Sequence, residues 1–513
     1  MNPADLEILR TAFAFVPEEM GLALKRTAYS PNIKERMDAS CAVFDTRGRM
    51  IAQAEHIPVH LGSMPVTMAH FLDAFGGDLW DGDQLIANDP YRGGSHLPDI
   101  TLAKPVFHAG RLIGFAVNRA HHADVGGVAP GSMPVGRRSL EQEGVVLAPA
   151  KWLRRGEESA DLRRQVEEGM RNPRERLGDL RAQVAANELG AQRLRQLYDK
   201  YGETQYGAFA DEILAYSERR VRAALASAPR GEYRAEDFLD DDGVSEFPLR
   251  IRCAITIGKD VHVDFAGTDG MSPGNVNAPL AVTLSAAYYV LRCLTDPDAP
   301  PNAGCHAPIH VTAPEGCLVN ARAPAAVAAG NVETSQRIVD ALFLALARAF
   351  PDRVPAQSQG TMNNLLIGSR DFAYYETIAG GEGALPYRYG MSGVHTHMTN
   401  TRNTPVEALE LAYPIRVEEY RLIPGSGGVG RFRGGDGVRR AIRFLGDEGT
   451  LTIVSDRRRF PPKGLAGGGD GRPGRNVLMR DGAEIPLPSK MTQEIRRGDL
   501  VVVETPGGGG WGE

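Results

Sequence analysis

Side chains that can bind a metal ion are concentrated in two short segments of this sequence. Asn88–Thr101 (NDPYRGGSHLPDIT) and Asn118–Gly127 (NRAHHADVGG) together contain Asp89, His96, Asp99, His121, His122 and Asp124. A seventh candidate, Asp38, lies in Lys34–Ser40 (KERMDAS). A site of two imidazoles and two carboxylates, without a thiolate, suits Mn, Fe or Zn at four to six coordination. With a coordination position open, such an ion lets a water molecule lose a proton near neutral pH and attack a carbonyl group.

Strand geometry limits which of these residues can act together. In a straight strand, residues three apart point to opposite faces, so His96 and Asp99 can share an ion only if the chain bends between them. Pro98 fixes its own φ and keeps Leu97 extended, which favours a defined bend. The adjacent His121 and His122 must diverge if the strand continues, and the spacing leaves open which of them faces an ion. The alternative is that these are buried His–Asp pairs that only satisfy each other.

The elements around these segments read as buried strands. The patterns predict strands at Cys41–Phe44, Met50–Ala54, Gln84–Ala87 and Arg111–Asn118, and the last of these is apolar on both faces. We therefore expect the polar segments to lie at the ends of buried strands. Helices are predicted at Asp5–Ala28 and Val66–Phe75, with Pro17 beginning a second segment of the first.

The remaining sequence predicts an α+β protein with a multi-layer mixed fold. Ser159–Tyr201 and Ala208–Ser227 are charged and amphipathic, Phe247–Phe265 contains two strands, and Pro279–Leu294 and Ser335–Phe350 are helical. Short strands and glycine turns dominate beyond residue 410, and the tail Thr505–Glu513 is a flexible or close-packed loop. The expected regions are a metal-binding α+β region (1–155), a charged helical insertion (156–230), a central α+β region (231–410) and a β-rich C-terminal region (411–513).

Composition argues against several classes of function. The 513 residues carry a net charge of -6, and acidic residues interleave with the Arg-rich stretches, so we expect neither nucleic acid nor a membrane as a partner. The five cysteines form no CxxC pair, which suits a reducing compartment. The first residues do not read as a signal peptide, and the apolar helical stretch Ile338–Phe350 is too short to span a bilayer. We therefore expect a soluble, cytoplasmic protein.

Two further patterns carry less weight. Gly425, Gly427 and Gly430 spell GxGxxG, but RFRGGDG follows instead of the helix whose N-terminus would bind phosphate. No GxxxxGK[ST] motif is present, so this sequence has no recognisable phosphate-binding loop of its own. His395 and His397 alternate and would face one way in an extended chain. They either form a second polar site or part of a substrate-binding wall, or they are surface histidines whose hydrogen bonds are already satisfied.

The sequence resembles the hydantoinase B/oxoprolinase family from end to end. The resemblance rests on long matching segments: Ser30–Asp45, His56–Pro65, Asn88–Ile100, His121–Gly127, Val263–Asp269, Ala313–Leu342, Asn400–Glu410, Gly425–Gly437 and the PGGGGWG tail. It implies a divalent metal (Mn, Zn or Fe) at Asp38, His96, Asp99 and His121. Spacing had already bracketed His96 and Asp99, whereas Asp38 and the choice of His121 over His122 follow from the resemblance alone.

The resemblance also implies an activity and a partner. It indicates a metal-carrying B-type subunit that opens cyclic amides (hydantoins, 5-oxoproline or lactams) together with an ATP-binding hydantoinase A-type subunit, in a hetero-oligomer such as α2β2. ATP in the partner would phosphorylate the amide carbonyl oxygen or form an activated bicarbonate-derived phosphate, which offsets amide resonance. The metal would then polarise the activated group or supply hydroxide. His122, Asp124 and Glu143 are candidates for acid–base residues or for residues that orient the ligands.

Three other functions compete with this one. The first is a subunit of an ATP-dependent ketone carboxylase of the acetone or acetophenone type. The second is a non-catalytic scaffold that only positions the ATP-binding subunit. The third is a stand-alone metallohydrolase that cleaves amides without ATP.

Overall fold

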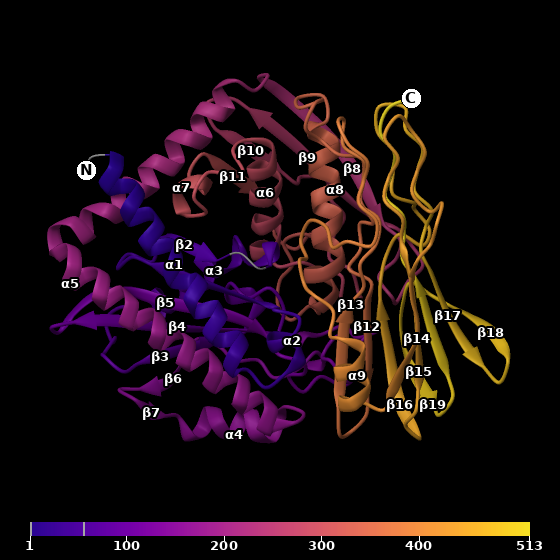
Figure 1. The fold of residues 1–513 in the computed structure, drawn as a ribbon, viewed down its shortest axis with the longest axis horizontal. Helices are drawn as coiled ribbons and strands as arrows, with labels where there is room; N and C mark the ends of the chain where they lie inside the picture. Colours follow the sequence, from indigo (N-terminus) through magenta and orange to yellow (C-terminus); the bar gives the residue numbers. More distant parts are fainter. Residues whose placement is uncertain (1–2, 55–56) are drawn as a thin grey trace.

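The computed structural model describes residues 3–54 and 57–513 and shows the α+β mixed fold that the sequence predicts. The chain runs from a helix-covered sheet, through a central group of helices and strands, to a region built of strands and glycine-rich loops, drawn from left to right in Figure 1. Within the described residues, no helix combines the length and the apolar character needed to cross a membrane.

The first sheet holds the predicted N-terminal strands. Its strands follow the order β2-β1-β5-β4-β3-β6-β7. Their bounds are β1 Ala39–Phe44, β2 Met50–Ala54, β3 Gln84–Ala87, β4 Asp99–His108, β5 Arg111–His121, β6 Ala150–Arg154 and β7 Glu157–Glu158. The helices α2 (Pro31–Lys34) and α3 (Ser63–Phe75) also belong to this part of the chain. The strands predicted at Met50–Ala54 and Gln84–Ala87 are confirmed at these bounds.

Strand β4 lies between β3 and β5 and was not predicted. Lys104 and Pro105 interrupt its apolar run, and proline weakens a strand assignment because it cannot donate to the ladder. As expected, the polar segments lie at the ends of buried strands, the first between β3 and β4 and the second at the end of β5. Asp99 begins β4, and His121 ends β5 beside it.

Long helices cover one face of this sheet. They are α1 (Pro3–Thr27), α4 (Ala160–Gly169) and α5 (Pro173–Ala226), and Phe13 of α1 stacks on Phe209 of α5 with ring centroids 4.4 Å apart. Pro17 lies inside α1, so the expected start of a second segment there is wrong. Packing of the buried Phe13 and Met20 on either side offsets the backbone hydrogen bond that proline cannot make. At Gly202 the backbone of α5 leaves helical geometry, between the two predicted helical stretches.

The central part of the chain combines a second sheet with buried helices. The sheet has the order β11-β10-β9-β8, with β8 Gly231–Leu239, β9 Leu249–Ile257, β10 Val261–Asp264 and β11 Ile309–Thr312. The helices are α6 Leu280–Leu294, α7 Ala303–His306 and α8 Ser335–Leu346. One turn of π-helix, Gly330–Thr334, leads directly into α8. Such turns often occur at functional sites.

Two antiparallel sheets form the C-terminal part. The first has the order β13-β12-β16-β19 and the second β14-β15-β20-β17-β18. Their bounds are β12 Asn364–Gly368, β13 Ala373–Thr377, β14 Ile415–Leu422, β15 Val438–Phe444, β16 Glu448–Val454, β17 Arg475–Arg480, β18 Ala483–Leu487, β19 Lys490–Arg496 and β20 Leu500–Glu504, and α9 spans Val406–Ala412. Strand β12 precedes residue 410 but pairs with β16 beyond it. The division into four regions stays a prediction.

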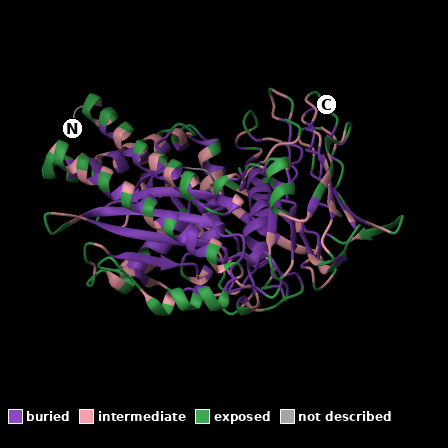
Figure 2. Ribbon diagram, turned by 60° about the horizontal axis from the view of Figure 1, so that its bottom comes forward, coloured by how far each residue is buried: buried purple, intermediate pink, exposed green. Residues whose placement is uncertain are grey.

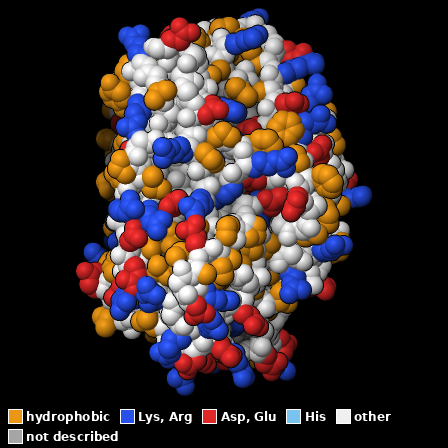
Figure 3. All heavy atoms as spheres, turned by 90° about the vertical axis from the view of Figure 1, so that its right-hand side faces the viewer, with side chains coloured by type: hydrophobic (Ala, Val, Ile, Leu, Met, Phe, Trp, Pro, Cys, Tyr) orange, Lys and Arg blue, Asp and Glu red, His pale blue; other side chains and the backbone are white. Residues whose placement is uncertain are grey.

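Burial follows the layers. The strands of the first sheet are buried almost throughout, and exposure is confined largely to the outer sides of helices, to loops and to strand ends (Figure 2). On the face formed by the C-terminal strands, acidic and basic side chains are interspersed (Figure 3). This face therefore presents no extended field of one sign.

The glycine tail is close-packed. Residues 505–510 are buried between glycine-rich loops. A Cβ atom on Gly508 would lie 2.0 Å from the carbonyl oxygen of Glu382, and one on Gly434 would lie 2.0 Å from that of Gly508. Gly428 N donates to Gly508 O at 2.8 Å, and Gly508 N donates to Gly435 O at 2.9 Å. Only glycine permits these backbone approaches.

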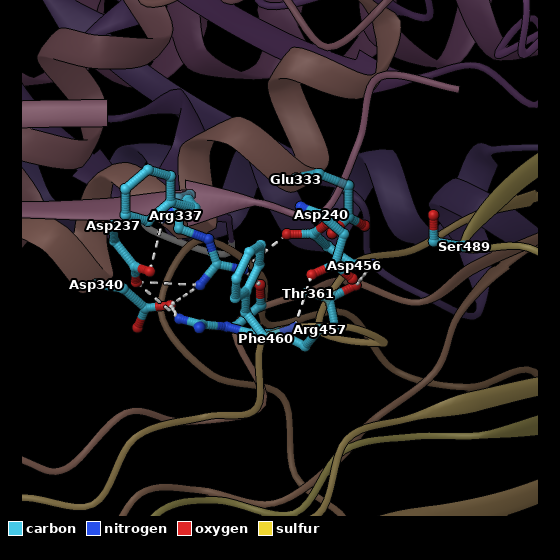
Figure 4. A network of polar contacts seen from close by, with 12 residues as sticks. Asp237, Asp240, Glu333, Arg337, Asp340, Thr361, Asp456, Arg457, Phe460 and Ser489 are labelled. Carbon is cyan, nitrogen blue, oxygen red and sulfur yellow. Dashed lines mark hydrogen bonds and ion pairs between the residues drawn. The ribbon is translucent and has the colours of Figure 1, made fainter. Parts of the chain in front are cut away.

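A buried ionic network joins the central and C-terminal parts (Figure 4). Arg337 of α8 pairs with Asp456, which follows β16, at 2.8 Å, and with Asp340 at 2.9 Å. Lys490 of β19 pairs with the other oxygen of Asp456 at 3.0 Å. Burial alone would raise the pKa of Asp456, but the Lys490 and Arg337 cations lower it below its ordinary value. The carboxylate is therefore held ionised between two buried cations.

We predict that Asp456→Asn destabilises the fold strongly. The change keeps the side-chain shape but leaves Arg337 and Lys490 short of a counter-charge, which costs about 3 kcal/mol or more when a buried pair is broken. The thermal unfolding midpoint measures the effect. The matched control is Asp447→Asn, because Asp447 pairs with Arg497 at the surface, where ion pairs contribute little. Equal midpoints for the two variants would contradict the prediction.

Candidate metal centre

Three residues of the predicted metal site lie in one row across the first sheet. In the antiparallel pairing, Asp99 of β4 stands opposite His121 of β5, and Ala39 of β1 stands opposite Ala120. His121 N donates to the carbonyl oxygen of Asp38 at 2.9 Å, so Asp38 continues this register just before β1. Directly paired residues project from the same face of a sheet. The pairing therefore directs Asp38, His121 and Asp99 to one side.

His96 joins this row from the turn that precedes β4. Its Nε2 lies 3.4 Å from Asp99 Oδ1, and its ring centroid lies 5.0 Å from that of His121. One ligand atom from each of His96, Asp99 and His121 can be chosen so that all three lie within 4.8 Å of one another. The chain thus bends between His96 and Asp99, as a shared ion requires. All three residues are buried.

Asp38 lies at the same place but is not part of that tight group of three. It lines a small cavity of about 20 Å³ together with Asp99 and His121. Such a volume accommodates an ion or a single water molecule. The guanidinium of Arg36 lies 4.0 Å from the Asp38 carboxylate. Burial raises the pKa of Asp38, Arg36 opposes this, and the like charge of Asp99 adds to it.

The residues present fit a divalent cation. Asp99 Oδ1 and His121 Nε2 are buried and have no hydrogen-bond partner among the described residues. Unsatisfied buried polar atoms are costly, and they are rare in native proteins unless a ligand satisfies them. Burial lowers the pKa of His121 well below its ordinary value, and although burial raises that of Asp99, the neighbouring His96 and His60 lower it overall. A neutral imidazole and an ionised carboxylate are the forms that bind metals.

His60 is a further member of the cluster that the sequence analysis missed. Its Nε2 lies 3.4 Å from Asp99 Oδ2, and its Nδ1 lies 2.9 Å from Ser40 Oγ of β1. His60 ends a short 3-10 turn, Pro58–His60, more than thirty residues before His96, so no ligand spacing indicated it. The one available signal was its place in the matching segment HIPVHLGSMP, whose first residue, His56, lies outside the described residues.

Two amides lie beside the imidazoles. Asn331 Nδ2, from the π-helical turn before α8, lies 3.3 Å from His96 Nε2. Asn32 Nδ2, from α2, lies 3.4 Å from His121 Nδ1. The ring of Tyr375 stacks on that of His121, with centroids 4.8 Å apart, and so covers one side of it. The cluster is therefore enclosed by elements that are distant in the sequence.

His122 points away from the cluster. Its Nε2 lies 2.9 Å from Gln183 Oε1 of α5, on the opposite side of the sheet from the row of ligands. Burial lowers the pKa of His122 to about 4, so the ring is neutral at physiological pH. Of the two adjacent histidines, the structure directs His121, not His122, toward Asp99.

Asp124 and Glu143 make contacts that hold loops in place. Asp124 accepts hydrogen bonds from Gly126 N and Gly131 N and pairs with Arg171 at 2.9 Å. Glu143 accepts from Val327 N at 3.1 Å and from Ala328 N at 2.9 Å, directly before the π-helical turn that carries Asn331. Burial raises the pKa of Glu143 to about 8, although these backbone donors oppose the shift. Asp89 caps its own turn by accepting from Tyr91 N at 2.9 Å.

Comparisons with known proteins give consistent results. A family model described as hydantoinase B/oxoprolinase matches residues 2–513. An uncharacterized protein of Methanocaldococcus jannaschii is 42% identical, and the match covers 100% of this chain and 91% of that protein. The B-type subunit of a putative D-/L-hydantoinase from a Pseudomonas species is 32% identical, with 100% of this chain and 90% of that protein covered.

Longer relatives match as well. A 5-oxoprolinase of Dictyostelium discoideum is 39% identical over all of this chain, which spans 40% of that protein's length. Among solved structures, an ATP-dependent caprolactamase from Pseudomonas jessenii has a TM-score of 0.93 at 29% identity, covering 100% of this chain and 91% of that one. An acetone carboxylase structure has a TM-score of 0.87 at 20% identity, covering 100% of this chain and 76% of that one, and shows the shared fold.

We predict that His121→Asn abolishes metal binding, whereas His122→Asn preserves it. Removing one imidazole from a buried donor set should lower the bound metal from about one equivalent per chain to below about a tenth. The neighbouring substitution changes a ring that faces α5. Elemental analysis of the purified chains measures this, with thermal unfolding confirming that both are folded. Metal retained by His121→Asn and lost by His122→Asn would reverse the assignment.

Proposed function

The chain belongs to the hydantoinase B/oxoprolinase family, and from this premise we propose that it is the metal-carrying subunit of an ATP-dependent enzyme that opens cyclic amides. The observation that supports this most directly is the buried cluster of His96, Asp99 and His121, with Asp38 beside it. Relatives named as a 5-oxoprolinase, a hydantoinase subunit and a caprolactamase all point to substrates with an amide in a ring.

We propose that ATP is bound by a separate hydantoinase A-type subunit. This sequence has no GxxxxGK[ST] loop, and the glycines of Gly425–Gly437 lead into strand β15 and not into a helix. The 5-oxoprolinase relative is more than twice as long as this chain, so the remainder of that protein can supply the missing activity. The two kinds of subunit would form a hetero-oligomer such as α2β2.

Asp38, His96, Asp99 and His121 would hold a divalent Mn, Zn or Fe ion. When bound, such an ion supplies a positive charge that polarises a carbonyl group and lowers the pKa of a water molecule. His60 supports Asp99 from the other side, because its Nδ1 is fixed by Ser40 while its Nε2 faces Asp99 Oδ2. The stacked ring of Tyr375 keeps bulk water from His121. These contacts pre-set the donor geometry before substrate arrives.

We propose positioning roles for His122, Asp124 and Glu143. His122 ties the end of β5 to Gln183, whose Nε2 donates to Ile100 O of β4 at 2.9 Å, so it helps to fix the two ligand-bearing strands. Asp124 holds the loop that follows β5. Glu143 fixes the backbone ahead of Asn331. None of these contacts requires the three side chains to exchange a proton with substrate.

We predict that the chain, co-purified with its ATP-binding partner, hydrolyses ATP only when a cyclic amide is present and releases the ring-opened amino acid. His96→Ala should reduce this activity by at least about a hundredfold, because it removes a metal ligand. Coupled ATPase measurement and chromatography of the product test this. His310→Ala is the control, since His310 lies exposed on β11.

The same measurement separates the competing functions. ATP turnover that requires a ketone and bicarbonate would show that the enzyme is a carboxylase and not a hydrolase. If the complex stays active after His96→Ala and the wild type holds far less than one equivalent of metal, the chain is a non-catalytic scaffold. Amide cleavage by this chain alone, without ATP, would favour a stand-alone metallohydrolase.

A further inference from the structure

The metal cavity is too small to hold a substrate ring. Its volume of about 20 Å³ suits one ion or one water molecule. A ring of five to seven atoms needs several times that space. If the proposed function holds, the ring must therefore lie in a different cavity that adjoins the metal centre.

A pocket of about 670 Å³ adjoins it along a single segment of chain. Residues of α6, α8 and the loops after them line this pocket, and His395, Thr396 and His397 form part of its wall. Met398, Thr399 and Thr401, which follow directly, line the metal cavity. Three residues of chain span at most about 11 Å, so His395 lies within about that distance of Met398 in the wall of the metal cavity. The volume lies in the range of small-molecule sites.

The chain turns sharply between the two cavities. His397 adopts a left-handed backbone conformation, with φ of 60°, which is uncommon for residues other than glycine. Its ring packs against Phe343 and Tyr289, with centroids 5.4 and 5.9 Å away. Gln336 Nε2, near the start of α8, donates to Thr396 O at 3.0 Å and fixes the segment from behind. Such locally strained backbone is often found at ligand sites.

His395 is a half-buried residue whose two ring nitrogens are buried and find no partner among the described residues. Neither its Nδ1 nor its Nε2 has a hydrogen-bond partner among the described residues, and both atoms are shielded from solvent. Burial lowers the pKa of His395 to about 4, and the Arg36 guanidinium near the metal cavity contributes to the same shift. A neutral imidazole offers one N–H donor and one bare nitrogen. A ligand that draws the ring toward the pocket can therefore pair with either nitrogen.

The charged residues of the pocket wall are Glu382, which is paired, and the neighbouring Asp352 and Arg353, which are both exposed. Glu382 forms a two-pronged pair with Arg388, at 2.7 and 2.8 Å. Arg353 is exposed and donates to the carbonyl oxygens of Leu294 and Thr295. Tyr289 and Phe343 supply aromatic surface. This lining favours an uncharged ligand with one polar edge over an anion.

We infer that this pocket holds the uncharged ring of a cyclic amide, with His395 as the hydrogen-bonding residue in the wall that adjoins the metal cavity. The assignment rests on the proposed function and makes it more specific. A ring amide carries one N–H donor and one carbonyl acceptor, either of which can pair with the neutral imidazole. Hydantoin and ε-caprolactam have this character, whereas 5-oxoproline adds a carboxylate, and Arg353, the cationic residue of the lining, is exposed and stands next to Asp352.

Steady-state kinetics of the complete complex, with ATP and each of these three compounds, test the inference. We expect hydantoin or ε-caprolactam to exceed 5-oxoproline in kcat/KM by about tenfold or more, because the carboxylate would lose solvation without gaining a partner. His395→Phe should raise KM for the preferred ring about tenfold, the effect of one lost buried hydrogen bond, with kcat within about twofold. Metal content should be unchanged.

Three variants sharpen the result. His395→Gln keeps a donor and an acceptor and should recover part of the lost affinity. Leu385→Trp narrows the pocket and should impair the seven-membered ring more than the five-membered one. His310→Phe, on exposed β11, should behave as wild type.

Each contrary result has a separate meaning. If KM is unchanged in both His395→Phe and Leu385→Trp, the pocket assignment is overturned. The proposed function still stands in that case, provided that the wild type opens the ring. A preference for 5-oxoproline would overturn the inference that the ligand is uncharged. Loss of metal from His395→Phe would place this residue in the metal centre instead. Failure of the wild type to open any of the three rings would overturn both proposals.

Discussion

The antiparallel register of β1, β5 and β4 places Asp38, His121 and Asp99 side by side. Side chains alternate between the two faces of a strand, so a slip of β5 by one residue would present His122 or Ala120 in place of His121. The strands are buried on both faces, which makes such a slip costly. Formation of the donor set is therefore tied to correct pairing of the sheet, and the loops that follow the strands only complete it.

The other half of the site comes from the central part of the chain. The π-helical turn before α8 brings Asn331 to His96, and Glu143 holds the backbone just ahead of that turn. In the same turn, Glu333 accepts from Met362 N at 3.2 Å, and Met362 lines the metal cavity. About one helical turn after Glu333, Arg337 enters the ionic network with Asp456. The metal cluster and the C-terminal sheets are thus connected through one short stretch of helix.

Much of the fold could be predicted because its signals are local. Strands such as Gln84–Ala87 and helices such as Pro279–Leu294 follow from apolar periodicity and their flanking turn residues. Strand β4 escaped detection because Lys104 and Pro105 interrupt its pattern, and Pro17 suggested a break that packing against α5 overrides. In the site, spacing bracketed His96 and Asp99, but the choice of His121 over His122 depends on which face of the sheet meets α5. The proximity of His60 depends on long-range folding that spacing does not encode.

The glycine tail has a consequence for efforts to change which rings the proposed pocket accepts. Gly508 rests on the backbone of Glu382 and Gly383, and Ala384 N donates to Gly509 O at 2.9 Å. Glu382 and Leu385 line the large pocket, so the last few residues of the chain form the outer support of its wall. Side chains introduced into this tail would collide with the backbone behind the pocket and displace the pocket wall, although no lining side chain had been changed. Engineering for altered specificity should therefore leave these glycines intact and diversify the side chains that face inward.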